Sequence, residues 1–430
     1  MTLFFALTLS SVYLLFALKG RSNLFSPRFL YNAFAWLKNV PYFIEVGETY
    51  SDVLCERYFI YKLIGCICVN IGISIYESKK IGKYSYSENV INIKSYYKYG
   101  ILFCFVGLLI KLYIFQSSGG VLYILSHIQA RKSLMAGNYY YELIANSLLT
   151  LSVLFTELYM IINNNKKGKI VFAFCLFITL VCLMIFGARH PALTLMLQVL
   201  MLYHFLKSKI TLSSIFKPRS IGIIGLVMMF MVMMPMLRAE SETDLISDPV
   251  EWAISAGNNI MSITREFSYL SGDMFVFDYF HDNEFWYGAS YINIFLQWIP
   301  RSVFPNKPPM DDGMYLLNMM YGEHVTPNMP TSKLYFDTSV PFTMEGTLYC
   351  NFGILGIIIG CILIGMLYQH VYKILCDTNY SIIMLLIYQA VMFVFVPSVL
   401  HTTSTLITAG VYSIILYLIF KIKIKKKRYN

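Results

Sequence analysis

Long apolar segments alternate with short polar ones along this chain, and one polar segment is far longer than the others. A helix needs roughly 17 to 25 residues to cross about 30 Å of hydrocarbon, and the apolar segments reach that length. We therefore expect an all-α polytopic membrane protein. Eleven spans are predicted, at residues 2–18, 29–45, 58–76, 97–116, 143–162, 170–187, 190–206, 220–237, 353–372, 381–400 and 404–421.

The spans divide the chain into three regions. Residues 1–237 hold eight spans, residues 238–352 form one large polar loop, and residues 353–430 hold three spans and a basic tail. Hydrophobic residues make up 57% of the chain and charged residues 13%, with a mean hydropathy of +0.58. A water-soluble globule of this length could not bury so much apolar surface.

Lys and Arg concentrate in alternate short loops and in the C-terminal tail, which marks that side as cytoplasmic. The alternation holds only if residues 29–45, despite Lys38 and Pro41, cross the membrane. The N-terminus and the 238–352 loop are then external and the C-terminus is cytoplasmic. The net charge of +10 follows from these topology signals and from attraction to anionic lipid, so it requires no nucleic-acid partner.

A few basic residues fall on the external side, where they suit an anionic ligand. Arg189 and His190 lie in a very tight turn that ends at Pro191, at the start of a span. The free amides and dipole of a helix N-terminus favour an anion there. Two other interpretations remain open: Arg189 extends to the lipid headgroups, and His190 is a structural histidine rather than a base. Headgroup contact is equally open for Arg238, at the outer end of another span.

The external loop carries two further candidate regions. Apolar residues at helical spacing predict an amphipathic helical region over 249–280, and Arg265 lies off the apolar stripe, free for an anion or paired with Glu266. The proline-rich segment 300–309 stiffens the backbone that presents Arg301 and Lys307. Arg binds phosphate bidentately and Lys as a point charge, which fits a lipid-linked phosphate.

Glu345 lies just before the ninth span, where it could accept a proton or bind sugar hydroxyls. A lone acid in an acid-rich loop is more often simply solvated. The same expectation applies to Asp273, Asp278 and Asp282, whose spacing matches no cation-binding pattern. We expect no metal and no cofactor. A Cys55 to Cys350 disulfide is left open.

Four features occur in a fixed order: Gly-x-Arg between two central spans, the long external loop, Pro-Arg-Ser-x-x-Pro-x-Lys-Pro, and x-Asn-Phe-Gly-x-x-Gly at the start of a span. Together they resemble the bacterial O-antigen and oligosaccharide repeat-unit polymerases of the Wzy type, over most of the chain. Members often carry an acid five positions before the Phe, where this chain has Thr347 and its own acid is Glu345.

The resemblance implies a metal-independent glycosyltransferase of GT-C-like architecture in the bacterial inner membrane. Such an enzyme joins undecaprenyl-pyrophosphate-linked oligosaccharide units at the outer face, in contact with membrane lipid and with a chain-length regulator protein as a further candidate partner. His190 or Glu345 would be the base for the acceptor hydroxyl. By similarity, the pyrophosphate would be held by Arg189, Arg238, Arg265, Arg301 and Lys307.

Three other functions compete with polymerisation. An O-antigen ligase would share the architecture but deliver the glycan to another acceptor. A flippase or transporter would need charged residues along the middle of several spans, and Lys62 and Lys111 are the main candidates. A structural scaffold would not need basic residues at outward helix ends.

Overall fold

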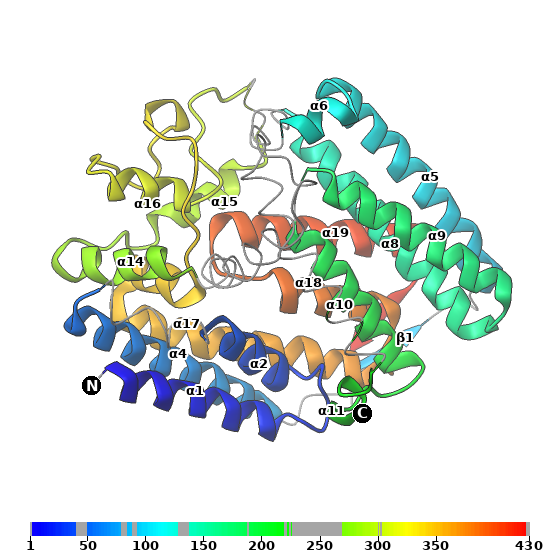
Figure 1. Ribbon diagram of the computed structural model, residues 1–430, viewed down its shortest axis with the longest axis horizontal. Helices are drawn as coiled ribbons and strands as arrows, with labels where there is room; N and C mark the ends of the chain where they lie inside the picture. The colour runs from blue at the N-terminus through cyan, green and yellow to red at the C-terminus, as the bar shows by residue number, and fades with distance from the viewer. Residues whose placement is uncertain are drawn as a thin grey trace, which may run out of the picture.

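The computed structural model shows a mostly helical protein (Figure 1). It describes residues 2–39, 50–78, 84–87, 93–127, 137–186, 189–218, 222, 225, 269–299, 301 and 303–426. The first half contains α1 (Thr2–Lys19), α2 (Pro27–Asn39), α4 (Asp52–Ser78), β1 (Tyr84–Ser87), α5 (Ile93–Ser117), α6 (Val121–Ser126), α8 (Tyr139–Asn163), α9 (Lys166–Met184), α10 (Arg189–Leu206) and α11 (Leu212–Ile215). The second half contains α14 (Leu270–Asp282), η2 (Ala289–Ile292), α15 (Asn293–Leu296), α16 (Gly313–Met320), η3 (Thr331–Lys333), α17 (Met344–Asp377), α18 (Ile382–Val394), α19 (Val399–Phe420) and β2 (Lys423–Lys426).

Seven of the described helices are long and apolar enough to cross a membrane, namely α1, α4, α5, α8, α9, α17 and α19. The helices α10 and α18 are apolar but shorter. The prediction of a multi-pass membrane protein is therefore confirmed. Several predicted spans match these helices closely, since residues 2–18 correspond to α1 and residues 97–116 lie within α5.

Three predicted segments fall partly or wholly outside the described residues. The span at 29–45 is described only as far as Asn39, as α2, and the span at 220–237 only at residues 222 and 225. The predicted amphipathic region 249–280 is described from residue 269 onward. Its described part forms α14, whose stripe residues Met274 and Phe277 are buried as the pattern predicted.

The predicted span at 381–400 is interrupted, because α18 ends and α19 begins inside it. Pro397 disfavours a helical conformation at the residue before it. The Ser398 side chain then caps α19 by accepting a hydrogen bond from the His401 amide at 3.4 Å. Because of this break, α19 begins within a segment that the hydrophobic pattern predicted as one continuous span.

The helices pack in two groups. The helices α1, α2 and α4 pack together, with α2 and α4 against α17, whereas α5, α8 and α9 form a second layer, with α10, α18 and α19 between them (Figure 1). Buried apolar side chains from both groups form the main core. Cys55 and Cys350 are both buried and free, so the disulfide left open by the sequence does not form.

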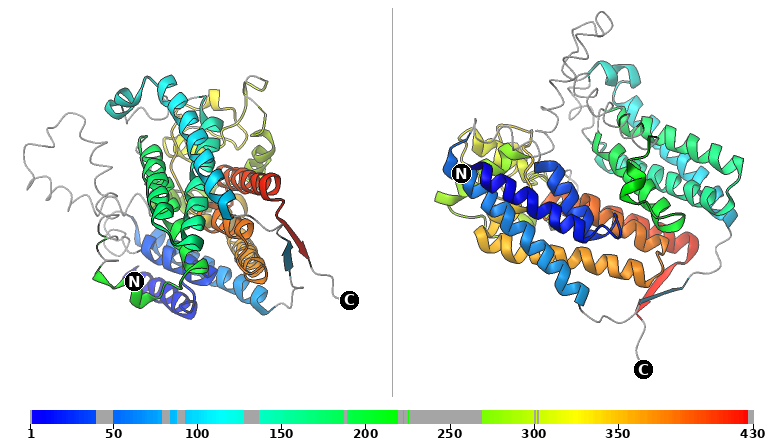
Figure 2. Two further views of the ribbon diagram at one scale, coloured as in Figure 1. Left: turned by 90° about the vertical axis from the view of Figure 1, so that its right-hand side faces the viewer. Right: turned by 60° about the horizontal axis from the view of Figure 1, so that its bottom comes forward.

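One end of the bundle is covered by the described part of the long polar loop. We call residues 269–299, 301 and 303–343 the loop cap; its helices α14, α15 and α16 lie together at the upper left of Figure 1. Contacts of α14 with α4 and α17, and of α15 with α19, attach the loop cap to the bundle. Elsewhere, β1 pairs with β2 in an antiparallel two-stranded sheet, which joins the C-terminal segment to the loop after α4 (Figure 2).

Candidate functional site

The long helix α17 is two helices folded against each other. Phe352 (φ −141°, ψ 15°) and Gly353 (φ 61°, ψ −152°) leave the helical conformation. A methyl group added at Gly356 would lie 2.4 Å from the Leu348 carbonyl oxygen, although eight residues of straight helix span about 12 Å. We call residues 344–351 the short arm and residues 354–377 the long arm of this hairpin. Only glycine adopts the positive φ at the turn without strain.

The loop cap holds the short arm in place by capping its C-terminal carbonyl groups. The Trp286 and Tyr287 amides donate to the Cys350 and Asn351 carbonyl oxygens, both at 2.9 Å. These bonds supply partners that the last turn of a helix lacks. The other end of the short arm, carrying Glu345, therefore points into the bundle rather than out of it.

Glu345 meets Lys62 of α4 and Asp273 of α14 in a buried ionic cluster. The Lys62 Nζ lies 2.7 Å from Asp273 Oδ2 and 2.9 Å from Glu345 Oε2, with side-chain exposures of 4%, 0% and 6% for the three residues. Lys62 lies ten residues into α4, which is about 15 Å along the helix. The cluster thus places two carboxylates and an ammonium group deep within the helical bundle.

Thr343, the N-cap of the short arm, connects the two carboxylates. Its amide donates to Asp273 Oδ1 at 2.8 Å, and its hydroxyl lies 2.7 Å from Asp273 Oδ2 and 2.9 Å from Glu345 Oε2. The hydroxyl has one hydrogen, so it can donate to only one of them at a time. Lys62 also donates to this hydroxyl oxygen. Tyr31 donates to the other oxygen of Glu345, Oε1, at 3.3 Å.

Lys62 contributes one positive charge and the two carboxylates contribute two negative charges when both are ionised, so the three residues then have a net charge of −1. Burial raises the pKa of the Asp273 carboxyl, although the Lys62 ammonium and the Thr343 donors oppose the shift. Gly65 of α4 permits the close packing, because a methyl group there would lie 2.7 Å from Glu345 Cγ. The arrangement suits a carboxylate pair that holds or releases a proton.

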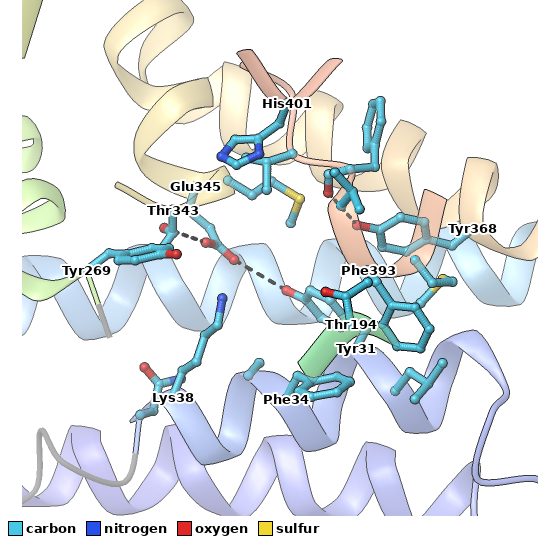
Figure 3. Close-up of a pocket in the computed structure, with 18 of the residues that line it drawn as sticks. Tyr31, Phe34, Lys38, Thr194, Tyr269, Thr343, Glu345, Tyr368, Phe393 and His401 are labelled. Atoms are coloured by element: carbon cyan, nitrogen blue, oxygen red, sulfur yellow. Dashed lines mark hydrogen bonds between the residues drawn. The ribbon is translucent and has the colours of Figure 1, made fainter. Parts of the chain in front are cut away.

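A cavity of about 310 Å³ adjoins this cluster. Figure 3 shows the Lys38 amine reaching toward the Glu345 carboxylate from the opposite wall. The Lys38 Nζ also lies 5.1 Å from the centroid of the Tyr269 ring, a cation–π geometry. The polar side of the cavity is formed by Tyr31, Lys38, Thr194, Tyr269, Glu345 and His401, and Phe34 and Phe393 belong to its apolar lining.

Two sequence interpretations are wrong. Asp273 was expected to be a solvated loop acid, and solvation was the alternative left open for Glu345, yet the two residues are 0% and 5% exposed and both bind Lys62. The sequence pattern missed the partnership because the three residues are far apart in the chain. The available signal was Lys38 and Lys62 within apolar segments, since charges there mark functional sites.

The predicted cationic residues are distributed differently from the expectation. Arg301 is exposed on the loop cap, where it donates to Thr331 Oγ1 at 3.1 Å. Lys307 is not an exposed point charge: it is 6% exposed, and its Nζ donates to the Gln297 and Ile299 carbonyl oxygens at 2.7 and 2.9 Å. Burial and the neighbouring Arg301 lower the pKa of Lys307. Lys307 therefore stabilises a loop by binding two backbone carbonyl groups, and its ammonium group is not exposed to bind phosphate.

Removing the Lys307 ammonium is expected to destabilise the loop cap. In a Lys307→Met variant, two carbonyl groups lose a charged donor, which costs about 1–3 kcal/mol. Thermal unfolding in detergent micelles would measure the loss. Lys333→Met, at an exposed position of the same loop cap, is the matched control and should change stability by less than about 0.5 kcal/mol. Equal effects of the two substitutions would contradict the structural role of Lys307.

The remaining candidates are placed only by the backbone or not at all. Arg189 and His190 begin α10, and the next turn of that helix supplies Thr194 to the cavity wall. The structure does not describe the side chains of these two residues, and it does not describe Arg238 or Arg265 at all. Among the described residues, no group of three or more His, Cys, Asp or Glu side chains is placed to hold a metal ion.

The site therefore consists of a cavity whose wall contains a buried carboxylate–ammonium cluster, at the start of a helix hairpin under the loop cap. The groups on its wall are of kinds that can accept a proton, at Glu345, and attract an anion, at Lys38. Comparison of the chain with protein-family models, with curated proteins and with solved structures gave no match.

Proposed function

We propose that this protein is a polymerase that joins undecaprenyl-pyrophosphate-linked oligosaccharide units, of the Wzy type that the sequence motifs resemble. The observation that carries the proposal is the place of Glu345 in the cavity wall, at the start of the short arm, which leads into the Asn351-Phe352-Gly353 motif at the turn. A carboxylate held by hydrogen bonds in a cavity wall can accept the proton of an acceptor hydroxyl. The motif that suggests the family thus forms the turn of the hairpin that carries Glu345, although none of its three residues lines the cavity.

The volume of the cavity fits a small acceptor group. Its volume of about 310 Å³ lies at the lower end of the range of about 300–1,000 Å³ for ligand sites. It therefore suits the terminal sugar of one oligosaccharide, while the remaining sugars and the lipid lie outside. Lys38 would stabilise negative charge as pyrophosphate leaves, with Arg189 at the start of α10 and Arg301 as further candidates.

The finer topology belongs to the same proposal. Eleven spans, a GT-C-like architecture, an inner-membrane location and an external loop cap follow from the charge pattern and the resemblance. The pairing of β1 with β2 supports one part of it, because the charge pattern assigns both segments to the cytoplasmic side. Lipid-linked oligosaccharide is the proposed substrate and a chain-length regulator a candidate partner.

Deleting the gene in its native host tests the function directly. The surface glycan, separated on a gel, should change from a ladder of lengths to a single repeat unit, and wild type should restore the ladder. Complete loss of attached glycan, with polymer still accumulating on the lipid carrier, would show a ligase and overturn the proposal.

Arg301→Ala is expected to shorten the ladder if Arg301 binds the leaving pyrophosphate. Loss of one charge-assisted contact of about 1.5–3 kcal/mol corresponds to a rate lower by roughly 10- to 150-fold. Complementation of the deletion strain at matched expression would measure this. Lys333→Ala, which removes another exposed charge from the loop cap, should leave the ladder intact. A full ladder with Arg301→Ala would exclude Arg301 from the site.

A transporter of a lipid-linked glycan is the second candidate. The observation that favours it is the discontinuous helix α17 with a charge cluster inside the bundle, a feature of secondary transporters. Lys111, the other candidate for a transport path, instead forms an ion pair with Glu142 at 3.3 Å. Loss of the protein would then leave unpolymerised lipid-linked units on the cytoplasmic side. Labelling of the glycan exposed on the external side would distinguish this result from a polymerase defect, in which the units are external.

A further inference from the structure

Two short helices of the loop cap, η2 and α15, carry apolar side chains on their outer face. They follow each other directly, and the residue after each helix keeps helical backbone angles. In such tight turns, residues three apart in the chain lie on the same face. Ile292, Phe295 and Trp298 have this spacing, and they are 56%, 77% and 54% exposed. We call these three side chains the apolar face.

The polar side chains of the same segment point inward. Asn293 and Gln297 are both buried in the loop cap, so the segment has the opposite arrangement to a surface helix in water, which turns its apolar side chains toward the core. Contiguous exposed apolar side chains mark an interaction surface. Residues 285–310 also contain no acidic side chain, so the segment has no negative charge that anionic lipid headgroups would repel.

A hydrogen bond attaches this segment to the start of α8, one of the helices long enough to cross a membrane. The hydroxyl of Tyr140, in the first turn of α8, donates to the Gln297 carbonyl oxygen at 2.9 Å. The exposed ring of Tyr141 lies 5.8 Å from the ring of Tyr113, near the end of α5. Tyrosine and tryptophan side chains at the ends of spanning helices mark the level of the lipid headgroups. The contact therefore places Gln297 and Trp298 at one boundary of the hydrocarbon layer.

A second contact, with α17, places the segment at the same boundary. The ring of Tyr291 lies 6.5 Å from the ring of Phe352, at the turn of the helix hairpin. The long arm begins at this turn and belongs to another candidate span. Its exposed residues Leu355, Ile359 and Leu363 are four apart, so they share one face of the helix. Exposed apolar side chains on a spanning helix face lipid, and the turn that leads into this face contacts the segment.

We propose that the apolar face lies in the lipid–water interface of the membrane, so that the loop cap rests on the bilayer. Amphipathic segments bury an apolar face about 5–10 Å into the boundary between headgroups and acyl chains. A protein partner fits less well. At roughly 150–250 Å² for each large side chain, the three offer less than the about 800 Å² per partner of a standard protein interface.

Lipid contact at this place would fix the height of the loop cap over the cavity. The helix α15 packs on α19 (Figure 1), and the first turn of α19 contains His401, which lines the cavity. The bilayer would therefore help to hold the loop cap and this part of the cavity wall in register. This consequence is independent of the reaction that the cavity performs.

A fluorescent label on the apolar face tests the proposal in the full-length protein. Phe295→Cys would be labelled with the polarity-sensitive dye NBD and reconstituted in vesicles of phosphatidylcholine and phosphatidylglycerol. We expect blue-shifted emission and quenching by a lipid that carries a nitroxide near its headgroup. Glu323→Cys, at an exposed position in the turn after α16, is the matched control. Its emission should be red-shifted, and aqueous iodide should quench it severalfold more strongly than the label at position 295.

The wild type, treated with the same reagent, gives the background from its own cysteines. An NBD group at position 295 that iodide quenches as strongly as the one at position 323 would overturn the proposal. Protection from both iodide and the lipid nitroxide would show that protein covers the apolar face, and would overturn it as well.

A second measurement needs no added cysteine. The chain has four tryptophans, and phosphatidylcholine brominated on its acyl chains quenches those that touch lipid. Bromination should therefore remove a smaller share of the tryptophan fluorescence in Trp298→Phe, a conservative change at an exposed position, than in the wild type. Equal shares in the two proteins would contradict lipid contact at Trp298.

Discussion

The Lys62→Met variant is expected to lose about 3–5 kcal/mol of unfolding free energy. Methionine fills a similar volume but leaves Asp273 and Glu345 as two buried carboxylates without their cation, at the 2.7 and 2.9 Å contacts described above. Their mutual repulsion adds to the cost of burial. Thermal or chemical unfolding in detergent micelles would measure the loss, and reduced expression would accompany it.

Two controls separate charge from packing. Arg28 and Glu77 form an ion pair with the same 2.7 Å contact, but the Glu77 side chain is 52% exposed, so Glu77→Gln should cost no more than about 1 kcal/mol. Adding Asp273→Asn and Glu345→Gln to Lys62→Met should recover much of the lost stability. If the triple variant were no more stable than Lys62→Met alone, the cluster would not owe its stability to charge compensation.

Glu345→Gln is expected to reduce polymer formation by about 10²- to 10⁴-fold, the usual contribution of a general base. The amide cannot accept the acceptor proton, yet it keeps the size of the side chain. Folding should survive, because Lys62 and Asp273 remain as a balanced pair at 2.7 Å. Gel analysis of surface glycan from the complemented deletion strain would show single repeat units in place of the ladder.

The control for this experiment is a carboxylate in the loop cap that lies outside the cavity. The Asp282 side chain is 83% exposed, so Asp282→Asn should leave the ladder unchanged. A normal ladder from Glu345→Gln, at wild-type expression, would mean that Glu345 only balances the charge of Lys62. The proposed reaction would then have no base at this site.

The long apolar helices could be predicted from the sequence because hydrophobic length alone decides them. Residues 2–18 and 143–162 were predicted as spans and correspond to α1 and α8, and residues 404–421 fall largely within α19. Transfer of apolar residues from water into hydrocarbon is a local property of each segment. No partner elsewhere in the chain has to be known for such a prediction.

The site could be predicted only in part. Glu345 was a candidate from its motif, but its partners Lys62 and Asp273 come from elements that are brought together by tertiary packing. The turn at Phe352 and Gly353 falls where the pattern placed the boundary between the polar loop and the ninth span, so residues 344–351 were assigned to the loop and not to a helix. Lys307 was assigned to a ligand because a sequence does not show which backbone carbonyls will surround an ammonium group.

The helix hairpin also constrains how the chain can be assembled in the bilayer. The short arm, residues 344–351, is about 12 Å long, too short for the insertion machinery to integrate as a segment of its own. Glu345 and Asp273 both come later in the chain than α4, so Lys62 is synthesised before either carboxylate that binds it. We therefore expect the contact between the two halves of the protein to form late in assembly, and the charge of Lys62 within an apolar helix to cost free energy until the carboxylates reach it.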